Sequence, residues 1–333
     1  MRPCMKTIKR LLALALIAAL MLAGGLTWYA SQPLRIEALP KTINVVPGTH
    51  LRQLSALLER EGVIDNAPLF WLLARALGRG DALKVGVYTF DRPLTPLALL
   101  ARIERGEVSQ VAVQLIEGWN WREVRAALAA QPLLKNDSAG MSDAELMQAI
   151  GAEESHPEGL LFPDTYFFAP HSSDLNVLRR AYRLQQEKLM AAWETRAPGL
   201  PYATPYEALI MASIVEKETG AAFERAEIAG VFVNRLRLRM RLQTDPTVIY
   251  GVGARFDGNL RKIDLQTDTP YNTYTRSGLP PTPIAMPGEA AIRAALNPAK
   301  TDALYFVSRN DGTHVFSSNL EAHNRAVNRY QRR

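Results

Sequence analysis

The chain has 333 residues, with 39 basic and 33 acidic side chains and a single cysteine, Cys4. Four of the basic residues and none of the acids lie in residues 1–30, so the rest carries 35 basic against 33 acidic side chains, or +2, which gives no footprint for nucleic-acid binding. Beyond Cys4 the chain can form no internal disulfide and offers no thiolate as nucleophile or metal ligand.

The N-terminus predicts a membrane anchor. An uncharged stretch runs from Leu11 to Ala30 behind the four basic residues, and a helix of about 20 such residues is what a hydrocarbon core of about 30 Å requires. Trp28 and Tyr29 fall where an interfacial aromatic belt would lie. A cleaved signal peptide is the alternative, but its apolar region has about 7–15 residues. We expect a cytoplasmic tail over 1–10, a transmembrane helix over 11–30 and the remainder on the outer side.

A linker and a small α+β module are predicted next. Residues 31–41 carry two prolines and no periodicity, which is typical of a linker. Residues 42–110 predict a strand at Ile43–Val45, a helix from Leu51 capped by Thr49, a helix at Pro68–Leu77 and a strand at Leu83–Phe90. The segment from Ile43 to Leu51 resembles the opening of a LysM domain, a peptidoglycan-binding fold, but lacks the usual acidic residue after the glycine. A generic α+β packing module is the alternative.

Residues 111–333 form the second predicted domain, also α+β. The expected elements are a strand from Val111, helices at Trp121–Ala130, Asp143–Ile150 and Asp174–Trp193, strands at Leu304–Ser308 and Thr313–Phe316 around a turn, and a basic helix from Leu320. Residues 242–288 are rich in Thr, Pro, Tyr, Asn and Gly, which favours ordered loops and short strands over long helices.

One further helix has well-marked ends. Thr204 can cap it, Pro205 suits its first position, Glu207 can complete a capping box, and Gly220 can end it. At about 100° per residue, the apolar residues between Ala208 and Val215 share one arc.

Two acids near the end of this helix project in different directions. Glu218 lies near the middle of the apolar arc, whereas Glu216 projects to the opposite side. Burial would raise the pKa of Glu218, and a carboxyl group that is still protonated near neutral pH suits a general acid. A structural ion pair at the helix end explains the same pattern, so periodicity alone leaves both interpretations open.

Eight short motifs stand in order between residues 158 and 317. They are Glu158–Tyr166, Ala212–Thr219, Val233–Leu236, Leu242–Gly251, Pro270–Tyr274, Gly278–Pro281, Tyr305–Val307 and His314–Ser317. Together they resemble the membrane-anchored endolytic murein transglycosylases, the MltG or YceG-like family. In that family the second glutamate of the Glu-Lys-Glu step is the catalytic acid/base, which corresponds to Glu218. Thr282 and Met286 depart from the family pattern and leave the shape of their loop in doubt.

The resemblance implies a YceG-like catalytic domain and a reaction that needs one carboxylate. Glu218 would protonate the oxygen of the MurNAc-GlcNAc β-1,4 bond and accept a proton from the C6 hydroxyl of the muramic acid, which is a tethered nucleophile. The product would be a 1,6-anhydroMurNAc end within a nascent strand, which would end strand elongation. No metal and no cofactor are implied.

The resemblance also implies a location and partners. The chain would be a single-pass protein of the bacterial inner membrane, with its N-terminus in the cytoplasm and its catalytic domain in the periplasm. Its partners would be peptidoglycan glycan strands and penicillin-binding protein synthases. Six residues are expected to bind glycan, with a role in turns, caps or the core as the alternative for each: Gln243, Asp245, Asn272, Tyr274, Glu158 and Tyr166.

Two other functions fit the sequence less well. The first is a non-catalytic peptidoglycan-binding scaffold of the cell-wall synthesis machinery. Such a scaffold would not need an acidic residue on the apolar face of the Glu218 helix. A hydrolytic muramidase would need a second carboxylate within about 5–9 Å of Glu218, and Asp245 or Glu158 could supply it. The five histidines form no zinc-protease motif, and no nucleophile elbow or phosphate loop occurs.

Overall fold

The computed structural model describes residues 5–36, 38–46, 48–79, 83–109, 111–218 and 220–331. Cys4 and Thr219 therefore lie outside the described residues. The chain divides into two compact units, Met1–Val111 and Ala112–Arg333. Both mix helices with two-stranded sheets, as an α+β chain should.

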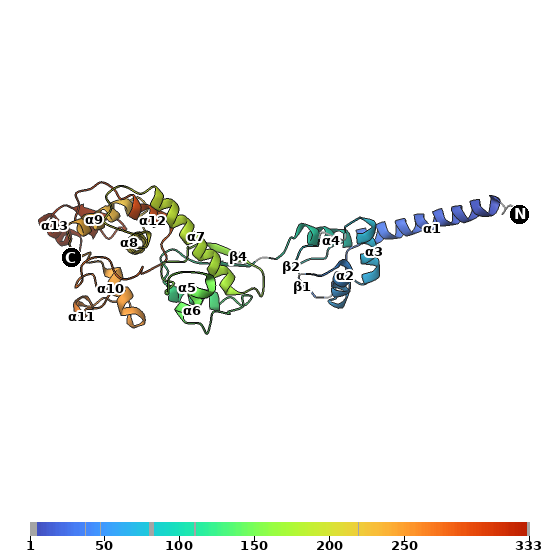
Figure 1. Cartoon of the computed structure of the whole chain (residues 1–333), viewed down its shortest axis with the longest axis horizontal. Helices are drawn as coiled ribbons and strands as arrows, with labels where there is room; N and C mark the ends of the chain where they lie inside the picture. The colour runs from blue at the N-terminus through green and yellow to red at the C-terminus, as the bar shows by residue number, and fades with distance from the viewer. Residues whose placement is uncertain are drawn as a thin grey trace. The chain divides into compact units, whose positions relative to one another are not determined.

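The first unit begins with a long apolar helix, α1 (Met5–Ser31), drawn in blue in Figure 1. Its segment Lys9–Ser31 is the one stretch among the described residues that is long and apolar enough to cross a membrane. The helix starts earlier than the predicted span over 11–30 because the basic residues before Leu11 continue the same helical turns. A single N-terminal helix of this kind is compatible with a single-pass anchor.

The segment after α1 was predicted to be a linker, and it is attached to the module that follows. Leu34 is buried in the core of the module, and its backbone N–H donates to the carbonyl of Leu94 at 2.8 Å. Regular structure resumes only at Lys41, where β1 begins. Its described residues between Ser31 and Lys41 form no helix or strand, as predicted for a linker, but the side chain of Leu34 is part of a core.

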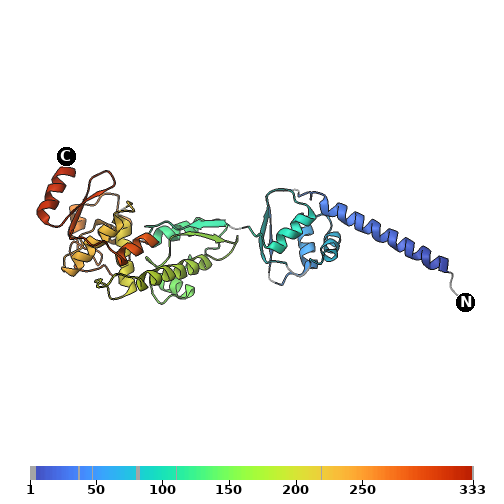
Figure 2. The same ribbon diagram turned by 90° about the horizontal axis from the view of Figure 1, so that it is seen from above.

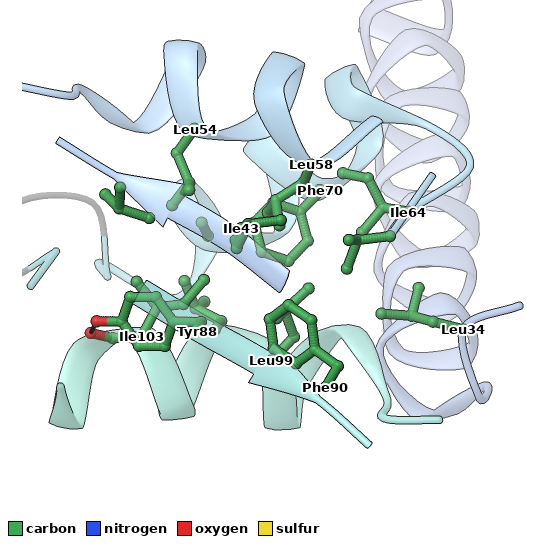
Figure 3. Close-up of a cluster of buried hydrophobic side chains, with 14 of the residues drawn as sticks. Leu34, Ile43, Leu54, Leu58, Ile64, Phe70, Tyr88, Phe90, Leu99 and Ile103 are labelled. Atoms are coloured by element: carbon green, nitrogen blue, oxygen red, sulfur yellow. Dashed lines mark hydrogen bonds between the residues drawn. The ribbon is translucent and has the colours of Figure 1, made fainter. Parts of the chain in front are cut away.

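The module has the predicted order of strand, helix, helix and strand, followed by another helix. Its elements are β1 (Lys41–Val45), α2 (Leu51–Arg60), α3 (Ala67–Ala76), β2 (Gly86–Phe90) and α4 (Pro96–Arg105). The strands pair antiparallel, with Ile43 opposite Tyr88. Figure 3 shows side chains of the helices, among them Leu54, Phe70 and Leu99, packed against this sheet. Because each element has one buried apolar face, this core holds the module together.

Two details of the module differ from the prediction. Thr49 is not the N-cap of α2, because His50 occupies that position and the Thr49 hydroxyl donates to the carbonyl of Val46 at 2.7 Å. Helix α4 was not predicted, although its start is marked in the sequence. Thr95 caps it through the N–H of Ala98, and Pro96 occupies its first turn.

The second unit contains most of the helices. Its elements are β3 (Val111–Gln114), α5 (Trp121–Ala129), α6 (Asp143–Ile150), β4 (Thr165–Phe168), α7 (Asp174–Glu194), α8 (Pro205–Glu218), α9 (Arg225–Arg237), α10 (Asp245–Val252), η1 (Gly253–Arg255), α11 (Lys262–Gln266), α12 (Glu289–Leu296), β5 (Tyr305–Ser308), β6 (His314–Ser317) and α13 (Leu320–Tyr330). Strands β3 and β4 form one two-stranded sheet (Figure 2), and β5 and β6 form an antiparallel hairpin. The elements predicted at 143–150, 174–193 and 304–316 lie where they were expected.

Helix α8 is the centre of this unit. It packs against α7, α9, α10 and α12, and Figure 1 shows α9 and α12 next to it. Every residue from Ala208 to Val215 is buried. The predicted apolar arc is therefore only part of a helix that is buried on all sides, and the arc does not by itself single out Glu218.

Residues 242–288 contain helices where loops and short strands were expected. Helices α10 and α11 lie in this stretch, and none of its described residues belongs to a strand. The polar residues of the stretch hold its loops together through side-chain hydrogen bonds. Thr282, one of the two departures from the family pattern, is an example: its hydroxyl lies 2.8 Å from the Tyr271 hydroxyl.

Candidate active site

Glu218 is the last residue of α8, so its position depends on how that helix begins and ends. The Thr204 hydroxyl accepts the N–H of Glu207 at 3.2 Å, as predicted for a cap. The carboxylate of Glu207 accepts the N–H of Ala203 and not that of the cap residue, so the capping box is shifted by one residue. The helix then runs without a break from Pro205 to Glu218.

Glu218 lies in a cavity of about 520 Å³ that is lined by residues from six elements, the loop before α10 and the loop that carries Tyr274. Its lining residues include Glu218, Arg235, Gln243, Thr244, Asp245, Tyr274, Tyr305, Phe306, His314 and His323. The wall combines aromatic rings with polar groups. This composition is typical of a site that binds a polar ligand with flat apolar faces.

The carboxyl group of Glu218 is half-buried and accepts a short hydrogen bond from the Thr244 hydroxyl. Burial raises the pKa of Glu218 to about 7, and the negative charge of Asp245 acts in the same direction. The hydrogen bond from Thr244 lowers the pKa, as do His314 and Arg235 through their electrostatic influence. The carboxyl group is therefore partly protonated near neutral pH, as predicted for a general acid.

The loop before α10 brings three polar residues to Glu218. Gln243 adopts a left-handed backbone conformation with φ of 51°, which is uncommon for a residue other than glycine and costs energy. Its N–H donates to the carbonyl of Thr273 at 3.2 Å, and this bond helps to hold the conformation. As a result Gln243, Thr244 and Asp245 all line the cavity, and the Tyr274 hydroxyl donates to Asp245 Oδ1 at 2.6 Å.

Of the six predicted glycan-binding residues, the structure places three in the cavity. Gln243, Asp245 and Tyr274 line it together with Glu218. Asn272 does not, because it is fully buried and its amide donates to three carbonyls at the end of α11 and its C-cap. Asn272 therefore holds the loop that carries Tyr274, whose N–H it accepts at 2.9 Å.

Tyr166 and Glu158 also lie away from the cavity wall. Tyr166 is buried, and its hydroxyl donates to the carbonyl of Phe162 at 2.7 Å. Glu158 is 2% exposed and accepts hydrogen bonds from the N–H of Trp121 and the hydroxyl of Tyr250. Burial raises the pKa of Glu158 to about 7. Both residues have structural partners, which was the alternative given for them.

Glu216 projects away from the apolar arc, as predicted, and the structure places it in a buried structural contact. Its side chain is 6% exposed, accepts the N–H of Gly288 at 2.9 Å and lies 3.8 Å from an Arg225 nitrogen. Burial raises its pKa. Because α8 is buried all round, its opposite face meets protein and not solvent.

Two residues that line the cavity, Arg235 and His314, had no predicted role. Arg235 is buried, donates to the carbonyls of Leu304 and Leu242, and lies 5.0 Å from the Tyr305 ring centroid. The sequence signal for Arg235 was its position within Val233–Leu236, one of the eight motifs. His314 lies 2.7 Å from Glu224 through Nδ1. The described residues contain no cluster of His, Cys, Asp or Glu that could hold a metal ion.

Comparisons with known proteins identify the family of the chain. The chain is 30% identical over 331 residues to a Bacillus subtilis (strain 168) protein named endolytic murein transglycosylase, covering 93% of this chain and 91% of that protein. A Streptococcus pneumoniae (strain D39) protein of the same name is 27% identical over 350 residues, covering 93% of this chain and 63% of that protein. A crystal structure of a YceG-like protein from Listeria monocytogenes has a TM-score of 0.54 and 29% identity, covering 85% of this chain and 97% of that one. Because residues 43–329 match the YceG-like family, the chain belongs to that family.

Proposed function

We propose that the chain is an endolytic murein transglycosylase that uses Glu218 as its acid/base residue. One observation carries the proposal: Glu218 is a half-buried carboxyl group with its pKa raised to about 7, and it lies in a cavity large enough for sugar residues. The relatives that bear this name match the chain across nearly its whole length. Glu218 alone can serve both proton transfers of such a reaction.

The reaction begins with protonated Glu218. It gives its proton to the oxygen of the MurNAc-GlcNAc β-1,4 bond, and the C6 hydroxyl of the same muramic acid attacks C1. Attack by a tethered hydroxyl has a very high effective concentration, so no water needs to be activated. The carboxylate then accepts the proton of that hydroxyl and is ready for another cycle. The strand acquires a 1,6-anhydroMurNAc end.

The cavity wall supplies the groups that would bind the glycan. Gln243, Asp245 and Tyr274 can form hydrogen bonds with sugar hydroxyl and amide groups, and the rings of Tyr305 and Phe306 can face the apolar side of a sugar. Asn272 supports this wall from outside the cavity, because it accepts the N–H of Tyr274. Tyr166 and Glu158 form hydrogen bonds with residues that do not line the cavity.

The first unit places the catalytic unit near its substrate. Helix α1 would anchor the chain in the bacterial inner membrane with the N-terminus in the cytoplasm, so that the remainder acts in the periplasm on nascent strands. The module at 42–110 would bind glycan as a LysM-like domain, which its strand, helix, helix and strand order supports. Penicillin-binding protein synthases would be neighbours of the chain because they make these strands.

Mass spectrometry of digested glycan tests the proposal. The full chain, purified in detergent, is incubated with polymerised peptidoglycan strands that lack 1,6-anhydro ends. The expected products are internal fragments with 1,6-anhydroMurNAc ends. Reducing MurNAc ends would instead identify a muramidase, and Asp245, which lines the same cavity, would be its candidate second carboxylate. Binding without any cleavage would identify a scaffold.

A further inference from the structure

His314 and Glu224 form a buried pair at the wall of the Glu218 cavity. His314 begins β6, and Glu224 precedes α9. Glu224 accepts the backbone N–H of His314 at 2.9 Å through Oε1 and lies 2.7 Å from the ring Nδ1 through Oε2. The side chains are 13% and 5% exposed. Two contacts on one carboxylate fix both the backbone and the ring of His314.

The contact with Glu224 determines what the other ring nitrogen can do. The carboxylate of Glu224 accepts the proton on Nδ1, which fixes the orientation of the ring and leaves Nε2 as the polar atom on its other side. Nε2 has no hydrogen-bond partner among the residues that the structure describes. His314 lines the cavity that contains Glu218, and its electrostatic influence reaches the Glu218 carboxyl group. The orienting partner lies behind the ring, and the free nitrogen is left for a ligand.

The surroundings of the ring favour a sugar as that ligand. Phe306 packs edge-on against His314, with 5.4 Å between the ring centroids, and Phe306 itself lines the cavity. An aromatic ring beside one oriented polar nitrogen suits an N-acetylhexosamine, which has an apolar face and hydroxyl groups around its rim.

From this geometry we infer that His314, oriented by Glu224, is a glycan-binding residue of the Glu218 site. Nε2 forms a hydrogen bond with a hydroxyl group of a sugar bound beside Glu218, since a hydroxyl can both donate and accept. This inference rests on the proposed transglycosylase function. It adds a specificity residue that takes no part in proton transfer.

The test separates the two nitrogens of the ring. His314→Asn retains a donor near the position of Nδ1 for Glu224 but has no atom at Nε2, whereas His314→Gln can place an amide near Nε2. Binding of uncleaved glycan strands is measured with the full chain in the Glu218→Gln background, and KM and kcat are measured with Glu218 present. We expect His314→Asn to weaken binding and raise KM by about fivefold to tenfold, the effect of one lost hydrogen bond. The change in kcat should stay within about threefold, and His314→Gln should recover part of the binding.

The controls keep this result distinct from that of the proposed function. His156→Asn makes the same change at a partly exposed histidine that does not line the cavity and lies 3.4 Å from Asp143. Asn can still accept the N–H of Glu158, which His156 accepts at 3.2 Å, so the change should alter neither KM nor binding. Unchanged KM and binding in His314→Asn, in an enzyme that yields 1,6-anhydro ends, would overturn the inference and leave the function intact. If the wild-type chain yields no such ends, the proposed function fails instead.

Discussion

The hydroxyl of Thr244 donates a hydrogen bond to Oε1 of Glu218, and this contact joins the end of α8 to the start of α10. Thr244 is the N-cap residue of α10, but its side chain forms no cap bond there and points to Glu218 instead. The next residue, Asp245, has the opposite effect on the pKa of the same carboxyl group. Burial is the main cause of the raised pKa of Glu218, and these two neighbouring residues adjust it in opposite directions.

The pKa of Glu218, about 7, predicts the pH dependence of cleavage. Only the protonated carboxyl group can act as the acid, and the protonated fraction falls as pH rises through the pKa. We expect kcat/KM to be level below pH 7 and to fall about tenfold per pH unit above it. Initial rates between pH 5 and 9 check this. A rate that rises through pH 7 would mean that Glu218 acts first as a base.

Replacing the two neighbours should move this limb in opposite directions. Thr244→Val removes the hydrogen bond that lowers the pKa of Glu218, so the limb should move to higher pH. Asp245→Asn removes a negative charge that raises the pKa, so the limb should move to lower pH. The second shift should be the smaller one and should shrink in salt, because Asp245 is exposed. Shifts of the same sign in both variants would contradict the assigned influences.

Glu218→Gln should abolish cleavage and leave binding intact. The amide keeps the size of the side chain and can still accept the Thr244 hydroxyl, but it has no proton to transfer. Because both steps of the reaction use Glu218, we expect a loss in kcat beyond the roughly 10²–10⁴ typical of one acid/base contribution. Product analysis and glycan pull-down of the same preparation measure the two properties. Loss of binding together with cleavage would instead indicate a disturbed cavity.

Local sequence signals predicted much of this fold. Helix α6 starts and ends where expected because Ser142 and Gly151 mark its ends, and α4 was missed although Thr95 and Pro96 mark its start. The candidate acid Glu218 was identified by periodicity and by motif. Periodicity would single out Glu218 only if the face of α8 opposite the apolar arc were exposed, and residues 208–215 have no exposed face.

The remainder of the site depends on contacts between distant segments. Glu224 and His314 are 90 positions apart, and Thr244 lies 26 positions after Glu218. No local pattern in a single sequence reports such pairs. The same reason explains why Asn272 was predicted to face the glycan: its polarity was visible, but the three carbonyls that it binds were not.

Glu216→Gln is the matched control for Glu218→Gln, and the structure predicts a different defect. Gln can still accept the N–H of Gly288, but Arg225 loses its nearby carboxylate, and the Nε of Arg225 is already buried without a hydrogen-bond partner among the described residues. We expect the free energy of unfolding to fall by about 1–2 kcal/mol. Cleavage by folded protein should stay within about threefold of wild type. Comparable losses of cleavage for both glutamates would contradict Glu218 as the sole acid/base.

The buried carboxyl group of Glu158 should make the stability of the second unit depend on pH. Its pKa is about 7 in the folded chain against an ordinary value of 4.5, so between these values the folded chain holds a proton that the unfolded chain releases. Stability must therefore fall as pH rises from about 4.5 to 7, and it should not change further through this group above that range.

Glu158→Gln cannot ionise and should escape this loss. The variant and the wild type should have similar stability at pH 5, and at pH 8 the variant should be more stable by up to about 3 kcal/mol, since each pKa unit corresponds to about 1.4 kcal/mol. Scanning calorimetry of the full chain at the two pH values measures the difference. Glu289→Gln is the control of opposite sign, because hydrogen bonds from Lys188 and Arg293 lower the pKa of Glu289, and its replacement should reduce stability at pH 8. A Glu158→Gln chain that is less stable than wild type at pH 8 would show that its bonds to Trp121 and Tyr250 outweigh the cost of burying the charge.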